Sequence, residues 1–179
     1  MTAPAPAYHF LSLCLLYPQA GWLSPLRETA AATGLPWPAE LVALAEAEPL
    51  ERLQIEHTRL FVNSAEGVPC PPYEAAYVDG HLLTATTAAV AAVYARWGLE
   101  HSLETADFLP VELQFVAYLS ELAAQTTLPE DRAAIEEARR RFQAEHLRPW
   151  LPRFAADLQQ HARLTFYREV GRQLAALNP

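Results

Sequence analysis

The chain has 179 residues and a formal net charge of −8, and its basic side chains are 13 arginines with no lysine. Half of the residues are apolar, which excludes an intrinsically disordered chain, and the acidic balance argues against a nucleic-acid or anionic-membrane partner. With 33 Ala and 27 Leu against two Ile and nine Val, the composition favours helix nearly throughout, so we expect one all-α domain.

The N-terminus lacks the features of an export signal. Residues 1–7 are rich in Ala and Pro and carry no basic residue, although residues 10–16 are apolar. No run approaches the roughly 18 apolar residues that a membrane-spanning helix needs. Cys14 and Cys70 have no close spacing that would suggest a zinc site or a disulfide framework. We therefore expect a soluble cytoplasmic protein without a metal or cofactor.

The N-terminal half, residues 1–62, should contain four helices. Proline cannot donate a backbone hydrogen bond inside a helix but is accepted in the first turn, so Pro residues mark where these helices begin or end. Apolar residues at helical spacing lie between the Pro positions. The expected ranges are 8–17, 24–33, 38–47 and 49–61.

Residues 63–80 form a Pro-rich connector. Pro69, Pro71 and Pro72 push the residues before them toward extended geometry, so a stiff segment must follow the fourth helix. A stiff loop that carries two Tyr, a Cys and a carboxylate can present a binding surface. The alternatives are a plain linker between two helical halves, or a hinge that allows a domain-swapped dimer instead of a monomer.

The C-terminal half, residues 81–179, should contain five helices, which gives a bundle of about eight or nine. The first is rich in Ala, and its small side chains suit a central position in the bundle. Asp107 precedes the second and is the type of residue that caps a helix N-terminus. The expected ranges are 81–97, 110–124, 129–147, 149–161 and 166–177.

Several acids and histidines could serve a catalytic site. Two carboxylates and one His can perform acid–base catalysis if they lie within hydrogen-bond reach, which would suit a small hydrolase. However, the sequence contains no nucleophile elbow, phosphate-binding Gly loop, HExxH motif or Cys/His cluster, so we do not expect an enzyme. The candidates are Glu56, His57, Glu74, Asp107, Glu112 and His146.

Three separate segments carry a common signature. The matching residues are Glu56, Leu60, Phe61, Pro71, Pro72, Tyr73, Glu74 and Tyr77, then Asp107, Glu112, Leu113 and Phe115, then Phe142, His146, Leu147 and Trp150. Together they resemble the TorD/DmsD/NarJ family, the cytoplasmic maturation chaperones of molybdenum enzymes. Three positions depart from the family pattern, because Asn63 replaces a usual Gly, Ala75 a usual Ser and Phe108 a usual His.

The resemblance implies a chaperone whose client is the catalytic subunit of a molybdopterin oxidoreductase. It would hold the twin-arginine-type leader at the client's N-terminus and assist cofactor insertion and assembly. The apolar part of the leader would lie in a groove as a helix, and its guanidinium groups would meet acids at the groove edge. A helical adaptor that binds another folded protein is the alternative. The expected peptide-binding residues are Glu56, Phe61, Pro71, Pro72, Tyr73, Glu74, Tyr77, Asp107, Glu112, Phe115, His146 and Trp150.

Overall fold

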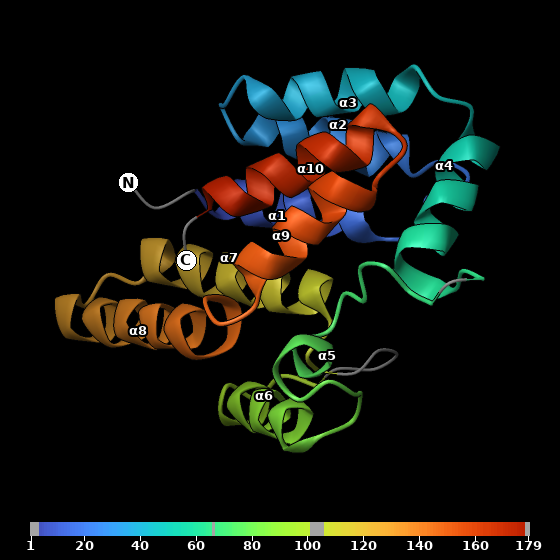
Figure 1. Ribbon diagram of the computed structural model, residues 1–179. Coiled ribbons are helices and arrows are strands. Elements are labelled where there is room, and N and C mark those ends of the chain that lie inside the picture. The colour runs from blue at the N-terminus through green and yellow to red at the C-terminus, as the bar shows by residue number, and fades with distance from the viewer. Residues whose placement is uncertain (1–3, 66, 101–105, 178–179) are drawn as a thin grey trace.

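The fold is helical throughout the part of the chain that the computed structural model describes, which is residues 4–65, 67–100 and 106–177. These residues contain ten α-helices, two π-helical turns and one isolated β-bridge, and no strand (Figure 1). The all-α prediction is therefore confirmed. The helices are α1 (Ala5–Leu15), α2 (Leu23–Ala32), α3 (Trp37–Glu46), α4 (Leu50–His57), α5 (Glu74–Val78), α6 (Ala85–Arg96), α7 (Leu109–Gln125), α8 (Pro129–Phe142), α9 (Leu151–His161) and α10 (Thr165–Ala176).

The nine expected helices are all present, and the tenth, α5, is a single turn inside the connector. Two expected helices end in π-helical turns, η1 (Thr58–Val62) after α4 and η2 (Gln143–Leu147) after α8. Helix α6 begins four residues later than expected because Thr84 caps it. The Thr84 side chain accepts a hydrogen bond from the Thr86 amide at 3.2 Å, and the Thr84 amide donates to Thr87 Oγ1 at 3.3 Å.

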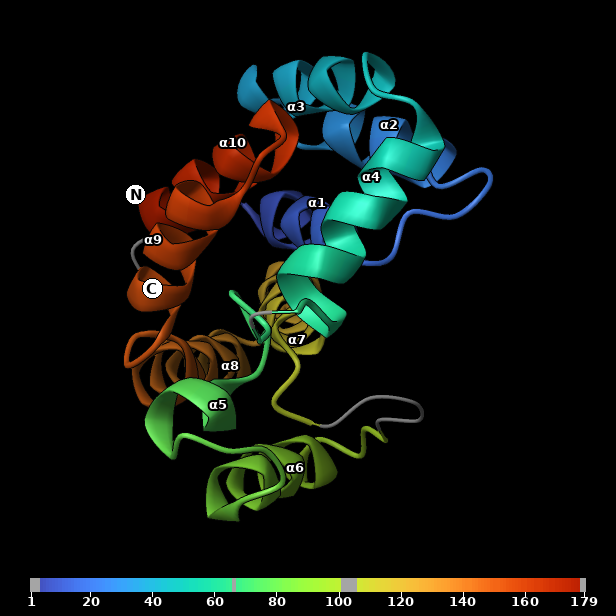
Figure 2. The same ribbon diagram turned by 45° about the vertical axis from the view of Figure 1, so that its right-hand side comes forward.

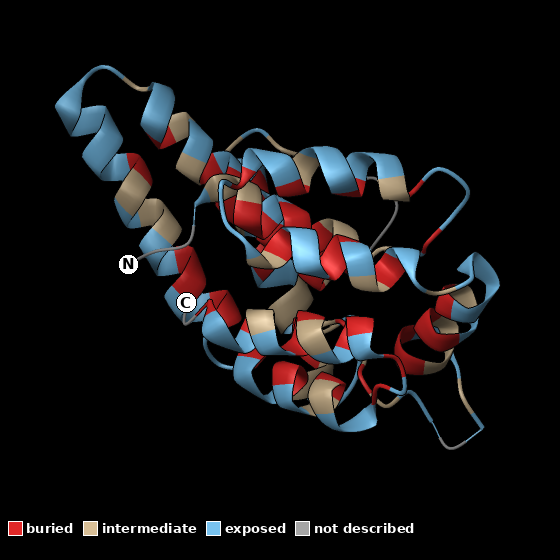
Figure 3. Cartoon of the chain, turned by 90° about the horizontal axis from the view of Figure 1, so that it is seen from above, coloured by how far each residue is buried: buried red, intermediate tan, exposed pale blue. Residues whose placement is uncertain are grey.

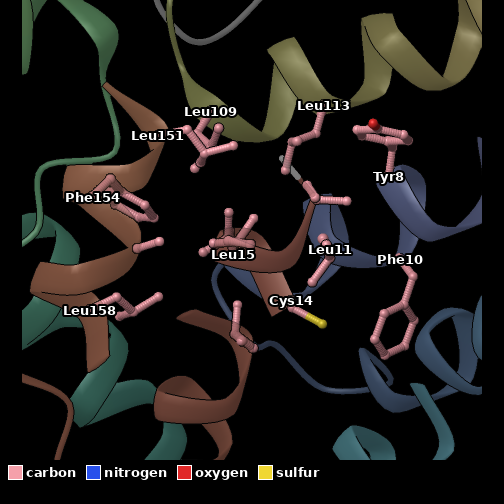
Figure 4. Packing of buried hydrophobic residues seen from close by; sticks show 14 of the residues in the cluster. Tyr8, Phe10, Leu11, Cys14, Leu15, Leu109, Leu113, Leu151, Phe154 and Leu158 are labelled. Carbon is pink, nitrogen blue, oxygen red and sulfur yellow. The ribbon is translucent and has the colours of Figure 1, made fainter. Parts of the chain in front are cut away.

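Helix α1 occupies the centre of the bundle. It packs against α7, α2 and α10, and Figure 2 shows it enclosed by the surrounding helices. Apolar side chains cover most of its circumference, as expected for a helix that is buried on all sides. Figure 4 shows its core side chains facing Leu109 and Leu113 of α7 and Leu151, Phe154 and Leu158 of α9. Each such buried side chain contributes roughly 1.5–3 kcal/mol.

The expectation that the Ala-rich helix would be central is wrong. Of the residues of α6, only Val90 and Tyr94 are buried, and the helix lies at the periphery beside α5 (Figure 2). Alanine side chains remove little apolar area from water, so a helix built from them gains less from a central position than α1 does. Burial is concentrated on the inward faces of the helices, and exposed residues cover the outer faces (Figure 3).

The two predicted halves contribute to one continuous hydrophobic core. Helix α1 packs on α7, and α3 packs on α10, so segments from both ends of the chain lie together. The division into residues 1–62, 63–80 and 81–179 stays a prediction. Within the described ranges, no helix has both the length and the apolar character that crossing a bilayer requires.

Candidate functional site

An isolated β-bridge joins the connector to the segment before α7. Tyr73 and Phe108 are paired in antiparallel orientation. The Glu74 amide donates to the Asp107 carbonyl at 3.0 Å, and the Leu109 amide donates to the Pro72 carbonyl at 2.9 Å. The rings of Tyr73 and Phe108 lie 5.3 Å apart, so Phe108, where the family usually has His, packs on the connector.

Asp107 caps a different helix from the one expected. The N-cap of α7 is Phe108, which makes no side-chain capping bond. The Asp107 carboxylate instead accepts a hydrogen bond at 2.9 Å from the amide of Ala75, in the first turn of α5. The antiparallel bridge causes this difference, because it places Asp107 opposite the start of α5. Asp107 therefore stabilises the connector helix from across the bridge.

Three acids and one histidine meet where α5, α7 and η2 come together. We call Glu74, Asp107, Glu112 and His146 the carboxyl cluster. All four are buried, and the acids are exposed by 3%, 1% and 0%. His146 Nδ1 lies 3.1 Å from Glu74 Oε2. Among the described residues, neither oxygen of Glu112 has a hydrogen-bond partner, and Asp107 Oδ1 also lacks one.

Burial dominates the electrostatics of the cluster. It raises the pKa of Glu112 well above the usual glutamate value, and the charges of Glu74 and Asp107 raise it further. Burial also raises the pKa of Glu74, although the hydrogen bond and the charge of His146 act in the opposite direction. Burial and the three nearby carboxylates likewise raise the pKa of the Tyr94 hydroxyl. Glu112 is thus the acid that most readily retains its proton.

Aromatic side chains pack beside the cluster. The Tyr77 ring lies 5.4 Å from Trp150 and 6.1 Å from Phe154, and the Arg153 guanidinium lies 5.4 Å from the centre of the Tyr77 ring. Phe61 of η1 lies 6.3 Å from the same Phe154. Phe154 of α9 therefore brings three of the predicted residues, Phe61, Tyr77 and Trp150, into one aromatic group.

Glu56 makes its contacts elsewhere. Its carboxylate accepts two hydrogen bonds at 2.8 Å from Arg59, as the spacing of three residues predicted, and a third from the Arg163 amide. Burial alone would raise the pKa of Glu56, but the Arg59 and Arg163 hydrogen bonds and the charge of Arg59 lower it below the usual value. Glu56 thus ties the end of α4 to the loop before α10.

The other predicted residues lie around the cluster at different depths. Pro72 is buried, whereas Pro71 and Tyr73 are half-buried. Phe115 packs between Phe142, at 4.8 Å, and Tyr94, at 4.9 Å.

A groove of about 340 Å³ separates α6 from α8 and η2. We call it the α6–α8 groove. His146 lines it and belongs also to the carboxyl cluster, which lies deeper. We expected the acids at the open edge of a groove. The three acids of the carboxyl cluster are instead enclosed behind it. The lining residues are Ala89, Ala92, Val93, Arg96, Trp97, Ala138, Arg141, Phe142, Glu145 and His146.

Comparison with known proteins identifies the family. A sequence profile of the family described as nitrate reductase delta subunit matches residues 27–156, most of the chain. The chain belongs to this family. The family comprises NarJ/TorD-type chaperones, so the predicted family is confirmed and the protein is a redox enzyme maturation chaperone.

A solved structure supports the same fold for this chaperone. It is the crystal structure of an Archaeoglobus fulgidus protein described as a redox enzyme maturation protein. The two share 24% sequence identity with a TM-score of 0.73, over 96% of this chain and 91% of that one. No curated protein matches the sequence.

Sequence reasoning missed two residues of the chaperone's site. Tyr94 faces the cluster and donates a hydrogen bond to the Ala106 carbonyl at 3.1 Å, and Phe154 is the centre of the aromatic group. Tyr94 carries a signal that could have been found, because it is an aromatic residue on a helix composed mostly of Ala. Over the described ranges, no three His, Cys, Asp or Glu residues are arranged to hold a metal ion.

Proposed function

We propose that this chaperone acts in the cytoplasm on the catalytic subunit of a molybdopterin oxidoreductase. It binds the twin-arginine-type leader at the N-terminus of that subunit and assists cofactor insertion and assembly. One observation carries the proposal, which is the convergence of residues from all three signature segments. Glu74 and His146 are 72 residues apart in sequence and 3.1 Å apart in space, and Ala75 contacts Asp107.

The α6–α8 groove suits the apolar part of a leader that binds as a helix. Ala89 and Ala92 permit close approach of a second helix, and Val93 and Phe142 offer apolar contact. Apolar burial supplies the affinity in such helix-in-groove complexes. Residues of the aromatic group, Tyr77 and Trp150, lie on the connector side and would extend the apolar surface once the connector moves.

The leader's arginines provide the second contact. Carboxylates bind guanidinium groups in bidentate fashion. Glu74 lies 3.1 Å from the groove residue His146, and Asp107 and Glu112 act electrostatically on Glu74. Because these acids are buried, the guanidinium groups reach them only when α5, which carries Glu74, separates from Asp107 and Glu112. Leader binding is therefore coupled to displacement of the connector, and the leader stays masked until the client has folded.

Co-purification from the native host, followed by identification of the bound polypeptide, tests the proposal. Calorimetry with a synthetic peptide of that polypeptide's leader then measures affinity. Ala92→Trp fills the groove and should abolish binding. Ala133→Trp, at an exposed position of α8 outside the groove, is the matched control and should bind like wild type.

The acids are tested with Glu74→Gln and Asp107→Asn. Both should weaken binding and reduce its dependence on salt, because each removes a charge that pairs with a guanidinium group. Unchanged affinity and salt dependence would refute the assignment of the acids. Equally tight binding of a folded client that lacks its leader would instead favour the helical adaptor.

A further inference from the structure

The carboxyl cluster joins the short helix α5 to α7 and η2. Glu74 comes from α5, Asp107 from the segment before α7, Glu112 from α7 and His146 from η2. The connector side is held by two backbone hydrogen bonds of the bridge, by the Ala75–Asp107 capping bond, and by the packing of the Tyr73 and Tyr77 rings on neighbouring aromatic side chains. Whatever changes the energy of the cluster therefore changes how firmly α5 is held against α7 and η2.

The charges in the cluster do not balance if every acid is ionised. Three carboxylates are buried there, and His146 is the basic side chain that contacts them among the described residues. Two uncompensated negative charges in a buried site are costly, and such a site reduces the cost by retaining a proton.

The geometry indicates which acid retains the proton. Glu74 has the contact with His146, and Asp107 accepts the hydrogen bond from the Ala75 amide. Glu112 is fully buried and has neither a cation nor a backbone donor within hydrogen-bond reach among the described residues. A neutral Glu112 also supplies the donor that the neighbouring Glu74 carboxylate can accept.

We propose that a proton on Glu112 holds the connector closed against α7 and η2, so that detachment of α5 releases this proton and becomes easier as the pH rises. Ionisation of Glu112 places a second negative charge next to Glu74, and the two carboxylates repel each other across the α5–α7 contact. The proposal concerns the free protein and goes beyond leader binding, although the same movement makes the acids accessible.

Most groups that face Glu112 favour its protonated form, and Trp150 opposes them, because its hydrogen bond lowers the pKa of Glu112. Glu74 and Asp107 disfavour its ionised form, and His146 of η2 favours the charged form of Glu74. Tyr94 of α6 stays neutral because its pKa is raised, and its hydroxyl donates to the Ala106 carbonyl. The Trp150 indole donates to the His146 carbonyl and so fixes the backbone that carries the imidazole.

The sign of the effect follows from linkage. Once α5 detaches, Glu112 loses the neighbouring charge of Glu74 and part of its burial, so its pKa falls toward the usual glutamate value of about 4.3. Between that value and the raised value of the closed form, the closed form holds a proton that the open form has lost. The stabilisation is thus complete below about pH 4.3 and is lost as the pH rises through the raised pKa, with about a tenfold change in the closed-to-open ratio per pH unit.

Carbon-13 NMR of glutamate-labelled protein tests the protonation state directly. The side-chain carboxyl of Glu112 should titrate well above the usual glutamate range, and its signal should disappear in Glu112→Gln. Glu121→Gln, which removes an exposed acid of the same helix, is the matched control for assignment. Titration of Glu112 in the usual range would overturn the proposal.

Amide hydrogen exchange tests the coupling to the connector. The amides of Glu74 and Ala75 both donate to Asp107 and report on detachment of α5. After correction for intrinsic exchange, their protection should fall about tenfold per pH unit in the wild type and stay constant in Glu112→Gln. Equal pH dependence in both proteins would overturn the proposal. The hydrogen-exchange experiment uses no peptide. A negative result would therefore leave the leader-binding proposal intact, and a protein that does not bind a leader could still show the pH-dependent exchange.

Discussion

Two buried glutamates of this chaperone show opposite solutions to the same problem. Glu56 and Glu112 are exposed by 4% and 0%, and both belong to the family signature. Glu56 receives hydrogen bonds from Arg59 and Arg163, which lower its pKa, whereas Glu112 has other carboxylates beside it, and its pKa is raised. The comparison teaches that burial raises the pKa of both acids, and that hydrogen-bond donors and a cation, as at Glu56, can outweigh it.

The two environments also suggest different roles. A satisfied ion pair such as Glu56–Arg59 fixes the geometry of the backbone around it, in this case the junction between η1 and the loop before α10. An acid without a partner, such as Glu112, responds to changes in its surroundings, because a proton or an incoming cation can neutralise it. Substitutions around Glu56 and around Glu112 should distinguish these two roles.

The largest effect is expected from Glu56→Ala. This change leaves the partly buried Arg59 guanidinium and the Arg163 amide without their acceptor, which should cost roughly 2–3 kcal/mol of unfolding free energy. Glu137→Ala removes an exposed partner of Arg140 and is the control, with an expected loss of about 0–1 kcal/mol. Urea unfolding at neutral pH measures both, and equal losses would contradict a structural role for Glu56.

A smaller effect is expected from Asp107→Ala. The loss of the cap on α5 should cost about 1 kcal/mol, whereas Asp107→Asn keeps an acceptor oxygen for the Ala75 amide and should cost less. Both changes remove a negative charge beside Glu112 and should therefore lower the pKa of Glu112. Urea unfolding and carbon-13 titration check the two expectations, and an unchanged titration of Glu112 would show that Asp107 does not act on it.

The smallest effect is a difference in pH dependence. Glu56 has a lowered pKa, so its stabilisation is present above the usual value of about 4.3 and is lost as the pH falls through the lowered value. Glu112 has a raised pKa, so its contribution is lost as the pH rises. Gln resembles protonated Glu, so the melting temperatures of Glu56→Gln and Glu112→Gln should both approach that of wild type at acid pH. As the pH rises they should depart from it in opposite directions, Glu56→Gln below wild type and Glu112→Gln above it, with shifts of about 2–4 °C per kcal/mol. Departure in the same direction would contradict the comparison.

Much of the fold could be predicted from the sequence. Pro positions and the dominance of Ala and Leu gave the all-α class and nine helices, because these signals act locally. The Glu56–Arg59 pair followed from its spacing of three residues on one helix. The prediction that the Ala-rich helix is central was wrong. The apolar area that a helix can bury depends on its own side chains, and not on how closely its neighbours can approach.

The site was predictable only in part. The resemblance selected Glu74, Asp107, Glu112 and His146, which do lie together, but their burial depends on how α5 folds back against α7. The cap was assigned to the wrong helix because the amide that Asp107 binds belongs to a residue 32 positions earlier in the chain. Local spacing carries no information on such a contact.

The π-helical turn η2 has a consequence for comparing relatives of this chaperone. A π-turn contains one residue more than the α-helix it interrupts, and each residue of an α-helix turns the side chain by about 100°. Removing one residue from Gln143–Leu147 would restore a regular helix and rotate the imidazole of His146 away from Glu74. Any homologue with a one-residue gap here should therefore carry its compensating base at another position of the alignment.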